Sequence, residues 1–271
     1  MTDLRVGRIS ALNMYPIYHH LERAHLPFVR FMDGLPSLLN DAVIAGDLDV
    51  SAMSSIAFAR NADTLKLIPV ASIACEGAVD SIRLFSRVPF DEVTRVAVTP
   101  HSASSITLLR ILMGPDAAFR VLGESPAAAL HAGDAVLLIA DEALEAHRSG
   151  LGPLSVDLGS LWQERTGLPM VFAVWAARDD AARRFPDEIA ALASAIAVAR
   201  EAYARDVDAV VQSAAERFPF PEDYIRAYLG GLRYEFGPAE HAGLSRFLQM
   251  AHDAGELDHV PAVETRTPMA A

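Results

Sequence analysis

The stretch "AGDLDVSAMSSIAFA", residues 45–59, is similar in pattern to "AGDAVLLIADEALEA", residues 132–146, and we call this internal similarity the echo. Each stretch reads as a helix end, a Gly-Asp turn, a buried strand and then a polar pair that opens a new helix. In this register Ser54 aligns with Asp141, and Ser55 aligns with Glu142. The echo predicts two similar α/β lobes, and two such strand-to-helix turns facing each other would form a ligand cleft between the lobes.

Strand-like runs alternate with helical runs along the chain, which predicts an α/β fold with mainly parallel sheets. Residues 37–46 and 104–114 predict helices that end at a glycine. After Asp187, apolar residues recur at steps of three and four, which indicates a long amphipathic helix broken once. The runs that predict strands are "LRVGRI", "LDVSAM", "LKLIPVASIA", "SIRLFS", "RVAVTP", "AVLLIA" and "MVFAVWAA".

Two of these segments, "SIRLFSR" and "VFAVWAA", are suited to cross between the lobes. We therefore expect residues 1–88 and 174–271 to form the first lobe, which includes the C-terminal helices. Residues 89–173 are expected to form the second lobe.

Composition excludes several classes of partner. The formal net charge is -12 and no basic cluster is present, so nucleic acid and anionic membranes are poor partners. No apolar run reaches the ~18 residues of a membrane span. The start "MTDLRVGRIS" lacks the features of a signal peptide, which predicts a cytoplasmic protein.

The sequence contains no motif for a metal or a nucleotide cofactor. Cys75 is the only cysteine, so a disulfide within the chain or a Cys-rich metal site is excluded, and we expect Cys75 in the core. Lys66 is the only lysine, and the Walker, G-x-G-x-x-G and H-E-x-x-H patterns are absent. We therefore expect chemistry without a metal or other cofactor.

Asn13 follows the first strand-like run within "RISALNMYPIY", residues 8–18. Asn favours turns because it tolerates left-handed backbone geometry. The loops after the carboxyl ends of strands also line ligand crevices, where an amide can donate and accept hydrogen bonds. Turn former and ligand contact both remain open from the residues alone.

Two further stretches place hydroxyl groups where a ligand can bind. In "GAVDSIRLFSR", residues 77–87, the Ser81 hydroxyl either forms a hydrogen bond with a backbone group or contacts a ligand. Burial statistics place Arg83 of the same stretch on the surface. In "VTPHSASSITLLRIL", residues 98–112, Ser102, Ser104 and Ser105 precede an amphipathic helix. One serine suffices to cap a helix, so three favour a cradle for a carboxylate or phosphate.

"DLGSLWQERTGLPMVFAVWAAR", residues 157–178, contains both tryptophans, Trp162 and Trp175, which we expect to be core anchors. This stretch resembles the chorismate dehydratase (MqnA) family of the futalosine route to menaquinone. "VGRISALNMYP", "AGDLDVSAMSSI", "SIRLFSR" and "HSASS" resemble the same family, in the same order, over about two-thirds of the chain. The resemblance implies a two-lobed periplasmic-binding-protein-like (type II) fold with the ligand between the lobes.

The resemblance also implies roles for individual residues. Asn13 and Ser81 match the positions closest to the chemistry. "LLIADEAL" is similar to the family's "IGD" turn, with Ala140 where the family has glycine. The residues that match substrate-binding positions are Ser54, Ser55, Ser102, Ser104, Ser105 and Asp141.

The implied activity is a cofactor-independent hydro-lyase that removes water from chorismate to give 3-[(1-carboxyvinyl)oxy]benzoate. A sister family, 1,4-dihydroxy-6-naphthoate synthase, uses a histidine base late in the second lobe. His131 and His147 lie in that neighbourhood but outside that family's motif, which favours the dehydratase. A non-catalytic cytoplasmic protein that binds small acids is the other alternative.

Overall fold

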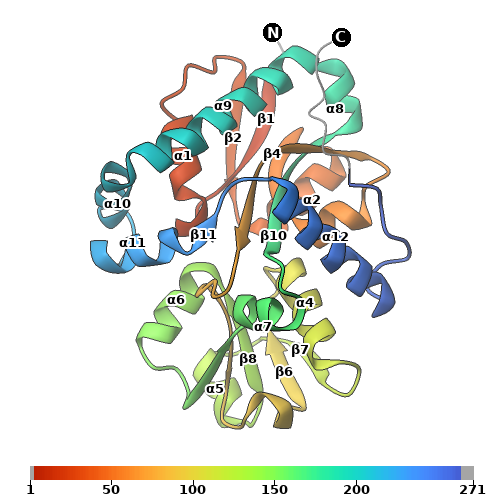
Figure 1. Ribbon diagram of the computed structural model, residues 1–271, viewed down its shortest axis with the longest axis vertical. Coiled ribbons are helices and arrows are strands. Elements are labelled where there is room, and N and C mark those ends of the chain that lie inside the picture. The colour runs from red at the N-terminus through yellow and green to blue at the C-terminus, as the bar shows by residue number, and fades with distance from the viewer. Residues whose placement is uncertain (1–2, 264–271) are drawn as a thin grey trace.

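The computed structural model describes residues 3–263 and contains two β-sheets, which lie one above the other in Figure 1. The six-stranded sheet has the order β11-β4-β10-β3-β1-β2, and the five-stranded sheet has the order β7-β6-β8-β5-β9. We name the lobes after their sheets, so the first lobe contains the six-stranded sheet and the second lobe the five-stranded sheet. The predicted two-lobed α/β class is confirmed.

The interior strands of each sheet are those with apolar runs in the sequence, and most of their residues are buried. The strands of the first lobe are β1 (Leu4–Ile9), β2 (Val29–Gly34), β3 (Val50–Ser54), β4 (Leu65–Cys75), β10 (Met170–Arg178) and β11 (Leu232–Arg233). The strands of the second lobe are β5 (Ile82–Ser86), β6 (Arg95–Val98), β7 (Ala118–Val121), β8 (Ala135–Ile139) and β9 (Leu154–Asp157).

The sheets are mixed, and the expectation of mainly parallel sheets is wrong. β1 pairs in parallel with β2 and β3, and β6 with β7 and β8. β10 runs antiparallel to β3 and β4, and β5 runs antiparallel to β8 and β9. β5 and β10 are the first strands that the chain forms after each crossing, and their direction opposes that of the strands beside them.

The chain crosses between the sheets at residues 76–81 and again at 158–169. A division at residues 88 and 174 would separate β5 from its own sheet and cut β10 in two. The crossings therefore lie a few residues before the boundaries expected from the sequence. In Figure 1, β4 points from the first lobe toward the second, whereas β10 runs antiparallel to it and leads back into the first lobe.

Helices follow most strands, as the echo predicts: α3 begins directly after β3, and α6 begins directly after β8. The helices before the return crossing are η1 (Leu12–Met14), α1 (Tyr15–Leu21), α2 (Pro36–Ala45), α3 (Ser55–Arg60), η2 (Phe90–Glu92), α4 (Ala103–Met113), α5 (Pro126–His131) and α6 (Ala140–Arg148). α2 and α4 end at Gly46 and Gly114, both with positive φ, as their sequences predict.

The later helices are α7 (Leu158–Thr166), α8 (Asp179–Arg184), α9 (Pro186–Arg205), α10 (Val207–Ala215), α11 (Glu222–Gly230) and α12 (Pro238–Asp253). The single break expected in the long amphipathic run lies at Asp206, whose side chain caps α10. Within residues 3–263, no helix combines the length and hydrophobicity that crossing a bilayer requires.

The core is anchored by the two tryptophans, as the sequence predicts. Trp162 is 0% and Trp175 is 2% exposed, and the Trp162 ring meets the Phe247 ring edge to face, with 6.1 Å between centroids. Cys75 is also buried, and burial raises the pKa of its thiol above the usual range. It is therefore a core residue and a poor nucleophile.

Candidate active site

A cavity of about 80 Å³ lies between the lobes and is lined by residues from both. Six of the predicted site residues line it: Asn13, Ser54, Ser81, Ser102, Ser104 and Ser105. Its apolar walls include Ile9, Met14, Met53, Ile73, Ile139 and Phe172. The echo thus leads to the geometry it predicts, in which strand ends and helix starts of both lobes face a common space.

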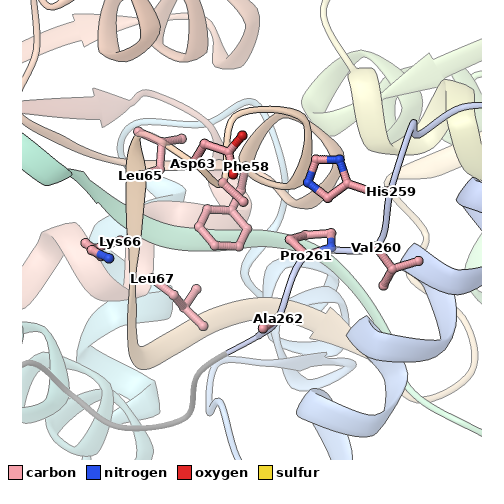
Figure 2. A pocket seen from close by; sticks show the side chains of 10 residues that line it. Phe58, Asp63, Leu65, Lys66, Leu67, His259, Val260, Pro261 and Ala262 are labelled. Atoms are coloured by element: carbon pink, nitrogen blue, oxygen red, sulfur yellow. The ribbon is translucent and has the colours of Figure 1, made fainter.

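A larger cavity of about 360 Å³, shown in Figure 2, lies elsewhere on the first lobe. It is bordered by Asp63, Lys66 and His259, and none of the predicted site residues lines it. The cavity between the lobes is therefore the candidate active site.

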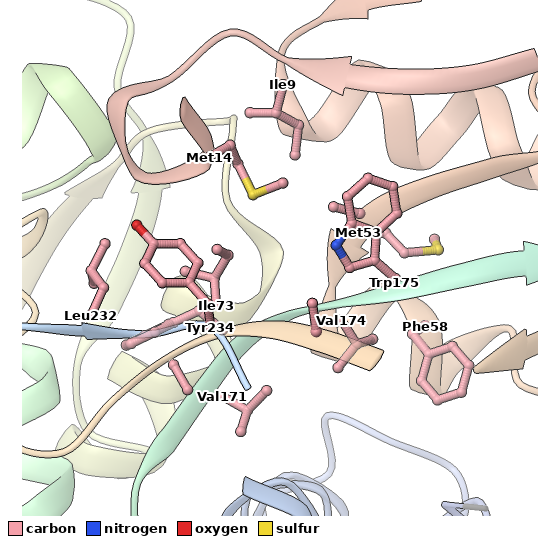
Figure 3. Close-up of a cluster of buried hydrophobic side chains, with 14 of the residues drawn as sticks. Ile9, Met14, Met53, Phe58, Ile73, Val171, Val174, Trp175, Leu232 and Tyr234 are labelled. Carbon is pink, nitrogen blue, oxygen red and sulfur yellow. The ribbon is translucent and has the colours of Figure 1, made fainter. Parts of the chain in front are cut away.

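Asn13 lies in the 3-10 turn η1, directly after β1. Its side-chain Oδ1 is buried and accepts no hydrogen bond from any residue between 3 and 263. Its backbone carbonyl accepts a hydrogen bond of 2.9 Å from the Tyr234 hydroxyl, and Figure 3 shows the Tyr234 ring beside Met14. The turn is held through the backbone, so the amide of Asn13 remains available to a ligand in the cavity.

Ser81 lies at the end of the first crossing, where the chain enters β5. It is 2% exposed, and it follows Asp80, a non-glycine residue with a φ of 56°. The Arg83 side chain is only 11% exposed, and the Asp80 and Asp157 carboxylates lie 3.0 and 3.3 Å from its Nη1. The surface position expected for Arg83 is therefore wrong, since burial statistics take no account of ion-pair partners.

Ser54 is the N-cap residue of α3, and Asn40 of α2 fixes it from both sides. The Asn40 amide donates to Ser54 Oγ at 3.1 Å, and the Ser54 backbone N–H donates to Asn40 Oδ1 at 3.3 Å. The neighbouring Ser55 does not line the cavity, because it is fully buried and donates to the Val171 carbonyl at 2.7 Å. The observed bond of Ser55 holds α3 against β10.

The three serines at the start of α4 cap the helix and also line the cavity. Ser102 Oγ accepts from the Ser105 backbone N–H at 3.3 Å and donates to Ser105 Oγ at 2.7 Å. Ser104 Oγ accepts from the backbone N–H of Ile56 in the first lobe at 3.2 Å. The expected cap and the expected polar lining therefore coexist at one helix start.

Asp141 lies in the first turn of α6 and is not among the residues that line the cavity. Its Oδ1 accepts from the backbone N–H of Leu12 in the first lobe at 3.1 Å. Burial raises the pKa of this carboxyl to about 6, and the charge of Glu145 acts in the same direction. Asp141 is thus placed at the junction of the lobes, outside the lining of the cavity.

The two lobes are closed on each other in this structure. The Leu12–Asp141 and Ile56–Ser104 bonds both join a helix start of the first lobe to a side chain of the second. A cavity of about 80 Å³ is also smaller than the ~300–1,000 Å³ of most small-molecule sites. We therefore expect the lobes to part to admit a ligand of substrate size and to close again around it.

His101 and Asn40 are site residues that the sequence analysis did not single out. His101 is the one ionisable side chain among the lining residues that the structure describes, and its Nδ1 lies 3.3 Å from Ser37 Oγ of the first lobe. His131 and His147, considered for the sister reaction, do not line the cavity. The position of His101 within "HSASS" was the available signal, because this stretch follows a strand end.

The arrangement provides hydroxyls, one amide and helix starts in an otherwise apolar space, which suits an anionic organic ligand.

The fold places the chain in the class of two-lobed, periplasmic-binding-protein-like proteins. The Candida albicans protein CA3427, described as having the generic periplasmic binding protein fold, superposes with a TM-score of 0.72 at 12% identity, over 96% of this chain and 92% of that one. The alkanesulfonate-binding protein SsuA from Xanthomonas axonopodis pv. citri, bound to MOPS, superposes with a TM-score of 0.69 at 15% identity, over 96% and 95%.

Sequence comparison narrows this class to one family. The family model described as menaquinone biosynthesis matches residues 4–253, and the chain belongs to this family. The chorismate dehydratase of Thermus thermophilus is 32% identical over 257 residues, which cover 88% of this chain and 91% of that protein.

Proposed function

We propose that this protein is a chorismate dehydratase, which removes water from chorismate to give 3-[(1-carboxyvinyl)oxy]benzoate for menaquinone biosynthesis. The observation that carries the proposal is the meeting of Asn13 and Ser81 in one cavity, where Asn13 Oδ1 accepts no hydrogen bond from residues 3–263. The family and the similarity to the Thermus enzyme supply the substrate. The cytoplasmic location expected from the sequence is part of the same proposal.

The reaction breaks a ring C–H bond and the neighbouring C–O bond, and the ring becomes aromatic. The proton leaves the carbon that carries the enolpyruvyl ether, the electron pair forms the new ring double bond, and the hydroxyl group departs and ends as water. Aromatisation makes the elimination favourable overall. The protein therefore has to orient the substrate and stabilise charge, and positioning alone can contribute ~7–11 kcal/mol.

The side chains at the cavity fit this limited requirement. The hydroxyls of Ser102 and Ser105, together with the free N–H groups at the start of α4, hold a substrate carboxylate. The Asn13 amide donates to the departing hydroxyl. No carboxylate of residues 3–263 lines the cavity, so in this proposal the substrate's own enolpyruvyl carboxylate accepts the proton.

The test is an assay of the purified protein with chorismate. We expect loss of the chorismate absorbance with formation of the substituted benzoate, identified by mass, without added metal or cofactor. Binding of chorismate without turnover would instead assign the protein to the non-catalytic acid-binding class.

A further inference from the structure

Asp141 holds a main-chain group on the opposite lobe. η1 begins at Leu12, and its N-cap residue Ala11 has no side-chain acceptor for the first free N–H. The Asp141 carboxylate accepts from this N–H at 3.1 Å. One lobe therefore caps the turn that carries Asn13 in the other lobe.

The turn has a second support that comes from its own lobe. The Tyr234 hydroxyl donates to the Asn13 carbonyl at 2.9 Å, and Tyr234 is buried. This support does not depend on the position of the second lobe. The bond from Asp141 forms only when the lobes close, so closure adds a constraint to the residue that precedes Asn13.

Asp141 is poorly suited to contact the substrate. It does not line the cavity, and chorismate would bring two carboxylates of the same charge. Its neighbour Ala140 has a φ of 51°, and this left-handed residue begins α6. The backbone of this turn therefore determines where the Asp141 carboxylate meets Leu12.

We propose that Asp141 is a positioning residue, which fixes η1 across the closed cleft and thereby orients the Asn13 amide for the elimination. The inference rests on the proposed function, because it assigns Asn13 to that reaction. It replaces the substrate-binding role that the sequence suggested for Asp141.

The experiment compares Asp141→Ala, Asp141→Asn and the matched control Asp116→Asn in the full chain. Asp116 is an exposed acidic residue between α4 and β7, so its variant removes a charge without acting on Asp141 or Leu12. The amide oxygen of Asn can still accept from the Leu12 N–H, whereas Ala cannot.

Steady-state dehydration of chorismate is the first readout. We expect Asp141→Ala to lower kcat by ~10–100-fold with little change in KM, because a misplaced catalytic group can cost ~10²-fold. Asp141→Asn should recover kcat to within a few-fold of the parent chain, and Asp116→Asn should match the parent chain. An Asn variant as poor as the Ala variant would overturn the proposal, because the charge itself would then be required.

Hydrogen exchange at the Leu12 amide is the second readout, and it does not depend on catalysis. We expect the amide to exchange faster in Asp141→Ala and to remain protected in Asp141→Asn. Equal protection in Asp141→Ala and the parent chain would overturn the proposed contact. If the parent chain fails to consume chorismate, the proposed function fails, and exchange at Leu12 still decides whether Asp141 holds the turn.

Discussion

Replacing Asp141 by Asn is expected to make the stability of this protein less sensitive to pH. Burial raises the pKa of the Asp141 carboxyl to about 6, from an ordinary value of 3.8. Between these two values the folded chain holds a proton that the unfolded chain has released. A state that binds more protons is disfavoured as pH rises, so the free energy of unfolding falls through this window and stays lower above it.

The size of the effect follows from the same two values. One pKa unit corresponds to ~1.4 kcal/mol, so the ionised Asp141 lowers the free energy of unfolding by about 3 kcal/mol at neutral pH. Asn keeps the shape and the oxygen that accepts from Leu12, but it does not ionise. The extra N–H donors of Asn change the stability of the variant by the same amount at every pH. The quantity to measure is therefore how the difference in the free energy of unfolding between Asp141→Asn and the parent chain changes with pH.

The assay is denaturant unfolding of the parent chain and Asp141→Asn at about pH 4 and about pH 8. We expect Asp141→Asn to gain about 2.5 kcal/mol relative to the parent chain between these conditions, because the unfolded carboxyl is already partly ionised at pH 4. Asp116→Asn makes the same change at an exposed position and should show no such gain. A difference that is constant across the pH range would refute the argument that burial penalises the Asp141 charge.

Three further predictions follow from the site. Asn13→Asp should lower turnover by ~10²–10³-fold with a nearly unchanged melting temperature, because it replaces the amide donors by an acceptor; near-normal turnover would return Asn13 to a turn-forming role. Ser102→Ala and Ser105→Ala should each raise the Michaelis constant for chorismate by roughly ten- to hundredfold. Ser102→Ala should also lower the free energy of unfolding, measured with denaturant, by ~1 kcal/mol, because α4 loses its N-cap. Unchanged Michaelis constants in both would limit these serines to capping. Ala140→Gly should raise the free energy of unfolding by ~0.5–1 kcal/mol, because glycine relieves ~1–2 kcal/mol of left-handed strain at some entropic cost, and a loss of stability would contradict the assigned strain.

The strands that the sequence analysis missed have a common physical reason. They are β2, β7, β9 and β11, and they form the four edges of the two sheets. An edge strand is covered on fewer sides than a central one, so it needs no continuous apolar run. β7, for example, is largely exposed, whereas every residue of the central strand β3 is buried. Apolar runs therefore identified all the interior strands and none of the edges.

The candidate site shows the same division between local and long-range information. Asn13, Ser54 and Ser102 follow strand ends, so a local pattern was sufficient to select them. The partner of Asp141 is 129 residues away along the chain, and the pairing of Asn40 with Ser54 depends on how α2 packs beside β3. Contacts of this kind are set by tertiary packing, and a single sequence contains no periodic signal for them.

The position of β10 in its sheet has a consequence for the order in which the protein folds during synthesis. β10 lies between β4 and β3, so the six-stranded sheet is divided into two parts until residues 170–178 have been made. The five-stranded sheet comes from the continuous segment 82–157 and is complete earlier. We expect the second lobe to form first on the ribosome. The edges of β3 and β4 that pair with β10 remain unpaired until β10 has been synthesised.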